Sequence, residues 1–199
     1  MESKIACMLI FLMSLQISKA QPVLYAGNNG HVNFYSSAPL EDIEASNSQV
    51  SSFLNTGKKT IEIKMLINQF DFKNKLMQEH FNENFMDSKR YPAASFKGKI
   101  YEDVDFKKPG VYPISATGEF ELHGVERIRT IKANLIIAAT GITIETQFDV
   151  LLEDHKIEVP EILFNKVAES IRVSGRLNLV AETLVTKKYF WVVNKKRPD

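Results

Sequence analysis

The polar residues with the best spacing for chemistry lie in the segment from Lys75 to Met86. His80, Glu83 and Asn84 are three and four positions apart there, so one helical turn would bring their side chains close together. An imidazole beside a carboxylate is a common general-base arrangement, and a small hydrolase is one interpretation of this group. The other interpretation is a polar rim beside the mouth of a barrel, with no reaction attached to it.

Motifs for other kinds of chemistry do not occur in the sequence. The four histidines are scattered, and HExxH, GxSxG, Walker A and GxGxxG sequences do not occur. The only cysteine, Cys7, lies in the first twenty residues, so the rest of the chain has no thiol for catalysis or for a metal. We therefore predict a protein that is not an enzyme, with no catalytic residues, no metal and no cofactor.

Residues 1–20 are predicted to be a secretory signal peptide. Lys4 gives a positive start, the apolar run Ile5–Leu15 is shorter than the about 20 residues of a membrane span, and Ser18 and Ala20 are suitable small residues before a cleavage site. Cleavage after Ala20 would place the mature protein in the periplasm or outside the cell. It would also remove two of the 25 basic and one of the 24 acidic residues, which leaves equal numbers of the two. A mature protein without net charge has no electrostatic attraction to nucleic acid, which argues against such a partner.

Alternating apolar and polar residues recur along residues 21–182 and predict β-strands. The clearest runs are Thr60–Ile67, Ile114–Leu122, Ile142–Leu152 and Ile171–Leu179. Turn signals separate the strands at Gly27–Gly30, Asn55–Gly57, Lys107–Gly110 and Thr140–Gly141. Helical signals are confined to Lys75–Met86 and Glu161–Val167. The pattern predicts one all-β domain, an antiparallel lipocalin-like β-barrel of about eight strands with one or two short helices.

Several segments in a fixed order resemble the YceI-like family. They are the strand Phe70–Phe72, a helix that carries Leu76, Met77, Phe81 and Phe85, a strand that starts at Tyr91-Pro92 and reaches Phe96, and the sequence Leu122-His123-Gly124-Val125. The resemblance covers roughly residues 25–180 and implies an exported β-barrel that binds a polyisoprenoid or a similar lipid. The N-terminal strand, residues 31–39, lacks the long aromatic-histidine pattern of the larger family members and is similar to a shorter subgroup.

The predicted function is non-enzymatic binding of an amphipathic lipid with a long apolar chain: an isoprenoid, an isoprenoid quinone or a fatty-acid-like chain. The predicted cavity wall comprises Ile63, Met65, Phe70, Phe81, Phe85, Phe96, Phe120, Ile144, Phe148, Val173 and Leu177. On the helix, Leu76, Met77, Phe81 and Phe85 are expected to be buried, while Gln78, Glu79 and Asn82 face water. Because eight strands can also close around a filled interior, a solid barrel that binds another protein is the alternative.

Residues 183–199 form a basic and aromatic C-terminal extension. Lysines and Arg197 surround an aromatic and apolar stretch between residues 187 and 197. Tryptophan and basic residues favour membrane surfaces, so peripheral membrane contact is one interpretation. A last strand or a charged, loosely packed end is the other. The chain is expected to be a monomer or a dimer.

Overall fold

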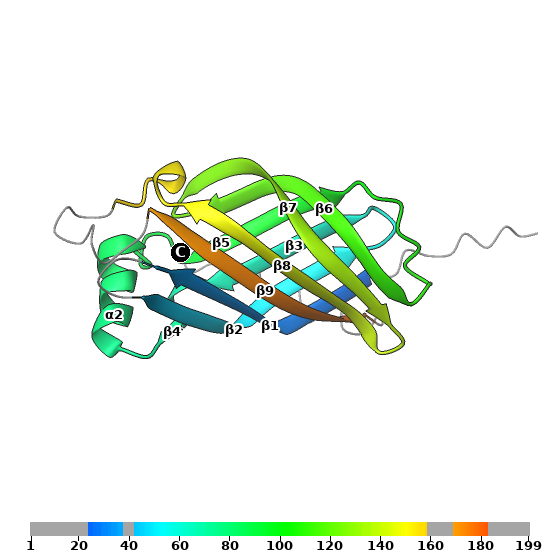
Figure 1. Ribbon diagram of the computed structural model, residues 1–199, viewed down its shortest axis with the longest axis horizontal. Helices are drawn as coiled ribbons and strands as arrows, with labels where there is room; N and C mark the ends of the chain where they lie inside the picture. Colours follow the sequence, from blue (N-terminus) through cyan, green and yellow to red (C-terminus); the bar gives the residue numbers. More distant parts are fainter. Residues whose placement is uncertain (1–23, 38–41, 159–168, 183–199) are drawn as a thin grey trace, which may run out of the picture.

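The computed structural model describes residues 24–37, 42–158 and 169–182. Most of these residues belong to a single antiparallel sheet (Figure 1). The strands are β1 (Leu24–Ser36), β2 (Ile43–Asn55), β3 (Thr60–Leu66), β4 (Asp71–Phe72), β5 (Ala93–Ile100), β6 (Gly110–Leu122), β7 (Val125–Ala138), β8 (Gly141–Leu151) and β9 (Ser170–Ala181). The predicted signal peptide, the second predicted helix and the C-terminal extension lie outside the described residues.

The sheet closes on itself because its first and last strands pair. The order β1-β9-β8-β7-β6-β5-β3-β2 returns to β1 through a β1–β2 ladder that runs from Leu24↔Asn55 to Ser36↔Ile43. The two-residue strand β4 adds only a short pairing to β2, at Ala45↔Phe72 and Ser46↔Asp71. The predicted antiparallel barrel of about eight strands is therefore confirmed.

One predicted turn is wrong. Gly27-Asn28-Asn29-Gly30 lies inside β1, where the β1–β2 register shifts on both sides of Gly30. A Cβ atom at Gly27 would clash with the carbonyl oxygen of Asn178 on β9. The two glycines thus allow a bulge and a close backbone approach within a strand, which is the other common role of glycine in a sheet.

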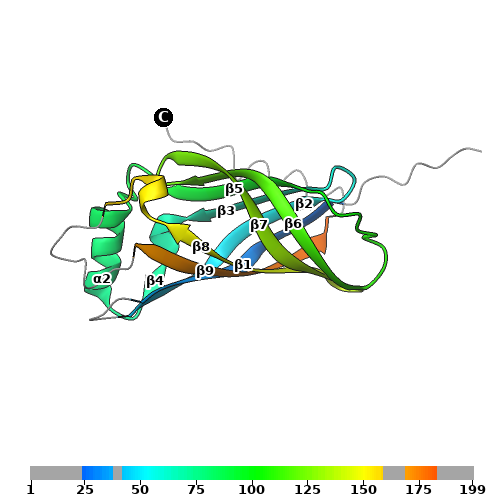
Figure 2. The same cartoon turned by 45° about the horizontal axis from the view of Figure 1, so that its top comes forward.

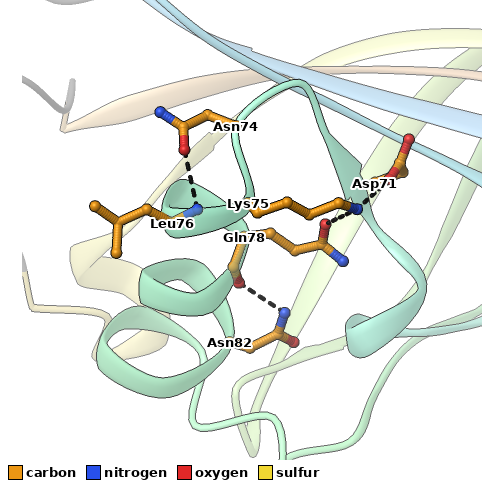
Figure 3. A network of polar contacts seen from close by, with 6 residues as sticks. All are labelled: Asp71, Asn74, Lys75, Leu76, Gln78 and Asn82. Atoms are coloured by element: carbon orange, nitrogen blue, oxygen red, sulfur yellow. Dashed lines mark hydrogen bonds and ion pairs between the residues drawn. The ribbon is translucent and has the colours of Figure 1, made fainter.

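A helical segment lies across one end of the barrel (Figures 1 and 2). It begins as the α-helix α2 (Lys75–His80) and continues as the π-helix η3 (Phe81–Phe85). The side chain of Asn74 accepts a hydrogen bond from the backbone N–H of Leu76 at 2.9 Å and so caps the first turn (Figure 3). Among the described residues, no helix has the length and apolar character needed to cross a membrane.

The buried face of this segment differs from the predicted one at Leu76. Met77, Phe81 and Phe85 are half-buried, but 57% of Leu76 is exposed. Met77, Phe81 and Phe85 follow one another at intervals of four residues and so share one face of the helical segment. Leu76 lies beside that face. On the opposite face Glu79 is exposed, whereas Gln78 and Asn82 are half-buried, and the amide of Asn82 donates to the carbonyl oxygen of Gln78 (Figure 3).

Two of the segments that resemble the YceI-like family contact each other at the same end. His123 and Gly124 form the two-residue turn between β6 and β7, and both have positive φ angles, 51° and 69°, as a type I′ hairpin turn requires. The ring of Tyr91 packs edge-on against His123, with 4.5 Å between ring centroids. A side chain at position 124 would collide with this tyrosine ring.

Candidate functional site

The barrel interior is hollow at the α2 end and filled at the other. At the far end Leu54, Ile100 and Leu135 are fully buried, and Ile142 and Leu179 are almost so. Toward α2 the interior opens into a chamber of about 320 Å³, at the lower end of the range of about 300–1,000 Å³ for ligand pockets. The open and the filled barrel, which the sequence left as alternatives, thus occur in different halves of one barrel.

This outer chamber has almost entirely apolar walls. Phenylalanine rings surround it near the helix: the centroid of Phe34 lies 5.4 Å from that of Phe70, 5.7 Å from Phe72 and 5.5 Å from Phe81. These rings come from β1, β4, η3 and the turn before β4. The cluster therefore ties the helix to the barrel and at the same time lines the chamber.

A second, smaller chamber of about 70 Å³ lies deeper in the barrel. Five residues line both chambers: Val32, Met65, Phe120, Phe148 and Val173. All eleven residues of the predicted cavity wall line one chamber or the other. Eight of them lie on strands, where every second side chain turns into the barrel, and Phe70, Phe81 and Phe85 come from the loop before β4 and from η3.

The polar groups of the outer chamber are few. Ser36, Asn74 and His80 line it together with the exposed Leu76, and Asn74 and His80 are themselves exposed. The side chains of Asn74, Leu76 and His80 therefore form the mouth of the chamber, where it opens to water.

The expected polar rim is only partly present. His80 lines the outer chamber, but Glu83 and Asn84 do not, and Glu83 lies 3.6 Å from Lys89 in an exposed ion pair. In the described ranges, no group of three His, Cys, Asp or Glu residues is placed to hold a metal ion.

The barrel wall is split between the first half of β7 and the second half of β8. Their ladder covers only Ala133–Ala138 and Gly141–Thr146. Beyond it, side chains make the connections: Thr146 donates to the carbonyl oxygen of Lys132 at 2.7 Å, and Arg129 donates to that of Asp149. Arg127 donates in the same way to the carbonyl oxygen of Asp154 at 3.0 Å.

Arg129 also stacks on two chamber residues. Its guanidinium carbon lies 4.9 Å from the ring centroid of Phe148 and 5.8 Å from that of Phe120. Partial burial lowers the pKa of Arg129, while Asp154 and Asp149 act in the opposite direction. The cation is thus held between the split wall and the aromatic lining of the chamber.

A short 3₁₀-helix, η4 (Glu153–His155), covers the end of this split (Figure 2). The buried ring of His155 contacts the carbonyl oxygen of Val125 through Nδ1 at 3.2 Å and packs edge-on against Phe120 at 5.1 Å. Burial lowers the pKa of His155, although the carbonyl oxygens of Val125 and Leu122 favour the protonated ring. His123 Nδ1 in turn lies 3.1 Å from the carbonyl oxygen of His155, so η4 is tied to the β6–β7 turn.

Sequence reasoning missed two important residues of this region. Phe34 is at the centre of the aromatic cluster, and the alternation of Val32, Phe34 and Ser36 with polar neighbours was a usable signal. Arg129 had no comparable signal, because a charged residue at an inward strand position is normally read as a break in the pattern.

An eight-stranded antiparallel barrel with an apolar chamber at one end belongs to the class of lipocalin-like barrels. Within this class the chain is a member of the YceI-like family, because the model of the YceI-like domain matches residues 27–179. The predicted membership is therefore confirmed. Among proteins of curated function, none matches the chain significantly.

Solved structures with the same fold come from several bacteria. A polyisoprenoid binding domain from Saccharophagus degradans, implicated in plant cell wall breakdown, has a TM-score of 0.69 at 14% identity and covers 81% of this chain and 99% of its own. BcnA of Burkholderia cenocepacia has a TM-score of 0.63 at 15% identity, with coverages of 75% and 95%. A mutant YceI protein of Campylobacter jejuni has a TM-score of 0.57 at 17% identity, with coverages of 72% and 87%. At these identities the similarity concerns the fold.

Proposed function

We propose that this protein binds an amphipathic lipid non-covalently and without chemical conversion. The apolar chain would occupy the outer chamber, and the polar head would stay at the mouth beside Asn74 and His80. The observation that carries the proposal is the apolar chamber of about 320 Å³ inside the barrel. A chain buried there gains about 0.8 kcal/mol per CH₂ group and needs no polar partner in the interior.

The eleven residues predicted as cavity wall are proposed as the wall of the lipid site. Seven of them line the outer chamber that the chain would occupy, and Ile63, Phe96, Ile144 and Leu177 line only the deep chamber beyond it. The family membership and the polyisoprenoid binding domain among the similar structures support an isoprenoid or an isoprenoid quinone as the ligand. A fatty-acid-like chain would satisfy the same apolar wall. We place the protein in the periplasm or outside the cell, with residues 1–20 removed.

A non-enzymatic role is supported by the positions of the polar residues. Of the group considered for hydrolysis, only His80 lines the outer chamber, and Glu83 pairs with Lys89. A general base needs to be within hydrogen-bond reach of the proton that it removes. Incubation with esters of fatty acids, followed by mass spectrometry of the products, tests this part, and turnover that Glu83→Gln abolishes would contradict it.

The direct test of binding is native mass spectrometry of the protein purified from its own host. We expect a bound species whose mass corresponds to a single lipid and which organic solvent releases. Titration with a fluorescent fatty acid or isoprenoid should then give a dissociation constant in the micromolar range, about −8 kcal/mol. Protein that copurifies with no lipid and binds neither probe would contradict the proposal.

A further inference from the structure

We propose that Phe120 and Phe148 form a gate that limits the length of the apolar chain in the outer chamber. The inference rests on the proposed lipid binding and adds a determinant of specificity to it. It concerns how far a chain reaches into the barrel, and therefore which chain lengths bind best.

The two rings lie where the chambers meet. Phe120 and Phe148 line both chambers, and their ring centroids are 6.1 Å apart in an edge-to-face arrangement. Beyond them the deep chamber measures only about 70 Å³. A chain that enters from the mouth beside α2 therefore meets this ring pair before it reaches the remaining space.

Arg129 holds the gate from the side of the barrel wall. Its guanidinium group faces both rings, at 4.9 Å and 5.8 Å, and donates to the carbonyl oxygen of Asp149 across the split between β7 and β8. His155 packs edge-on against Phe120 from the end of the barrel. Since each ring is restrained by a neighbour outside the chambers, Arg129 acts as a positioning residue for the gate.

The proposed gate predicts how the affinity depends on the length of the apolar chain. Each added methylene that becomes buried raises the affinity about fourfold. Once the chain end meets the rings, further methylenes stay in water at the mouth and add little. Affinity should thus rise steeply along a series of chains and then reach a plateau.

The experiment measures dissociation constants for saturated fatty acids from octanoate to stearate, by displacement of a fluorescent fatty acid. Phe148→Ala opens the passage to the deep chamber. We expect it to move the plateau to longer chains by roughly two methylenes or more, each worth about fourfold in affinity. Phe85→Ala is the matched control, because Phe85 lines the outer chamber alone. It should change the affinity for all chains and leave the plateau where it is.

Arg129→Gln provides a second variant with the gate residues intact. It removes the cation from both rings, and we expect a less sharp plateau that extends to longer chains. Arg127→Gln is its control: Arg127 is on the same strand and the same face and also donates to a backbone carbonyl. A loss of stability alone would not move the plateau, so chain-length profiles separate positioning from a purely structural role.

The outcomes distinguish the gate from the function on which it rests. If the unmodified protein binds no fatty acid and no isoprenoid probe, the proposed function fails and the gate fails with it. If the unmodified protein binds but the plateau is the same in Phe148→Ala, Arg129→Gln and both controls, lipid binding stands and the gate is refuted. Affinity that keeps rising through stearate in the unmodified protein also refutes the gate.

Discussion

Replacing Phe34 by alanine tests the aromatic cluster that joins the helix to the barrel. Phe34 is only 8% exposed and packs against Phe70, Phe72 and Phe81 at centroid distances of 5.4–5.7 Å. Deleting a buried phenylalanine side chain costs about 3–5 kcal/mol. Phe34 also lines the outer chamber, so the vacated space joins an existing cavity and creates no sealed void. We therefore expect a loss near the lower limit, about 3 kcal/mol.

The assay is urea unfolding followed by far-ultraviolet circular dichroism. The midpoint should fall while the slope of the free energy with urea stays constant, because the surface exposed on unfolding barely changes. For a domain of this size the same loss lowers the melting temperature by about 6–12 °C. Tyr101→Ala is the control, since Tyr101 is 68% exposed, and its effect should stay within about 0.5 kcal/mol. A loss below about 1 kcal/mol for Phe34→Ala would refute the reasoning.

Three further predictions address other parts of the molecule. First, N-terminal sequencing of the protein from its host should begin at Gln21, and a mature protein that retains residues 5–15 contradicts export by cleavage. Second, burial lowers the pKa of His155 from 6.5; the unfolded chain then binds more protons below pH 6.5, so the free energy of unfolding should decrease as the pH falls through this region. His155→Gln should remove much of that slope in urea titrations at several pH values, and an unchanged slope argues against the assignment. Third, Asn74→Ala should destabilise the first turn of α2 by about 1 kcal/mol and speed hydrogen exchange there about fivefold. Asn74→Asp should retain slow exchange, because a carboxylate also caps a helix.

Local sequence patterns were sufficient for the sheet and for its two faces. Each strand turns alternate side chains inward whatever its partner is, so period-two alternation identified residues such as Ile63, Phe96 and Phe148 as interior. The His123-Gly124 turn and the capping Asn74 are likewise local, since their geometry depends on a few neighbouring residues. The alternation and the helical spacing were enough to predict an antiparallel barrel with a short helix, whereas the position of that helix across one end was seen only in the structure (Figure 1).

Several features depended on contacts between distant segments and could not be derived from any one of them. Gly27 and Gly30 looked like a turn, and only the approach of β9 explains why they form a bulge within β1. Leu76 looked buried, but the helical segment packs on the barrel through Phe81, which contacts Phe34 and Phe72, and Leu76 stays 57% exposed. In each case the local residues permit two conformations, and packing against another part of the chain selects one.

The sequence by itself determined that this protein is an antiparallel barrel with an apolar interior, because alternation is a property of single strands. Only the tertiary structure decided how much of that interior is empty. The answer depends on how side chains from eight strands fill a shared lumen, and on where β7 and β8 separate. Arg129 shows the difference most clearly: along the sequence it is an isolated charge, whereas in the barrel it lies against Phe148 at the junction of the two chambers. The packing density of the interior and the separation of β7 from β8 depend on many residues that are far apart in the chain, so no local sequence pattern can predict them.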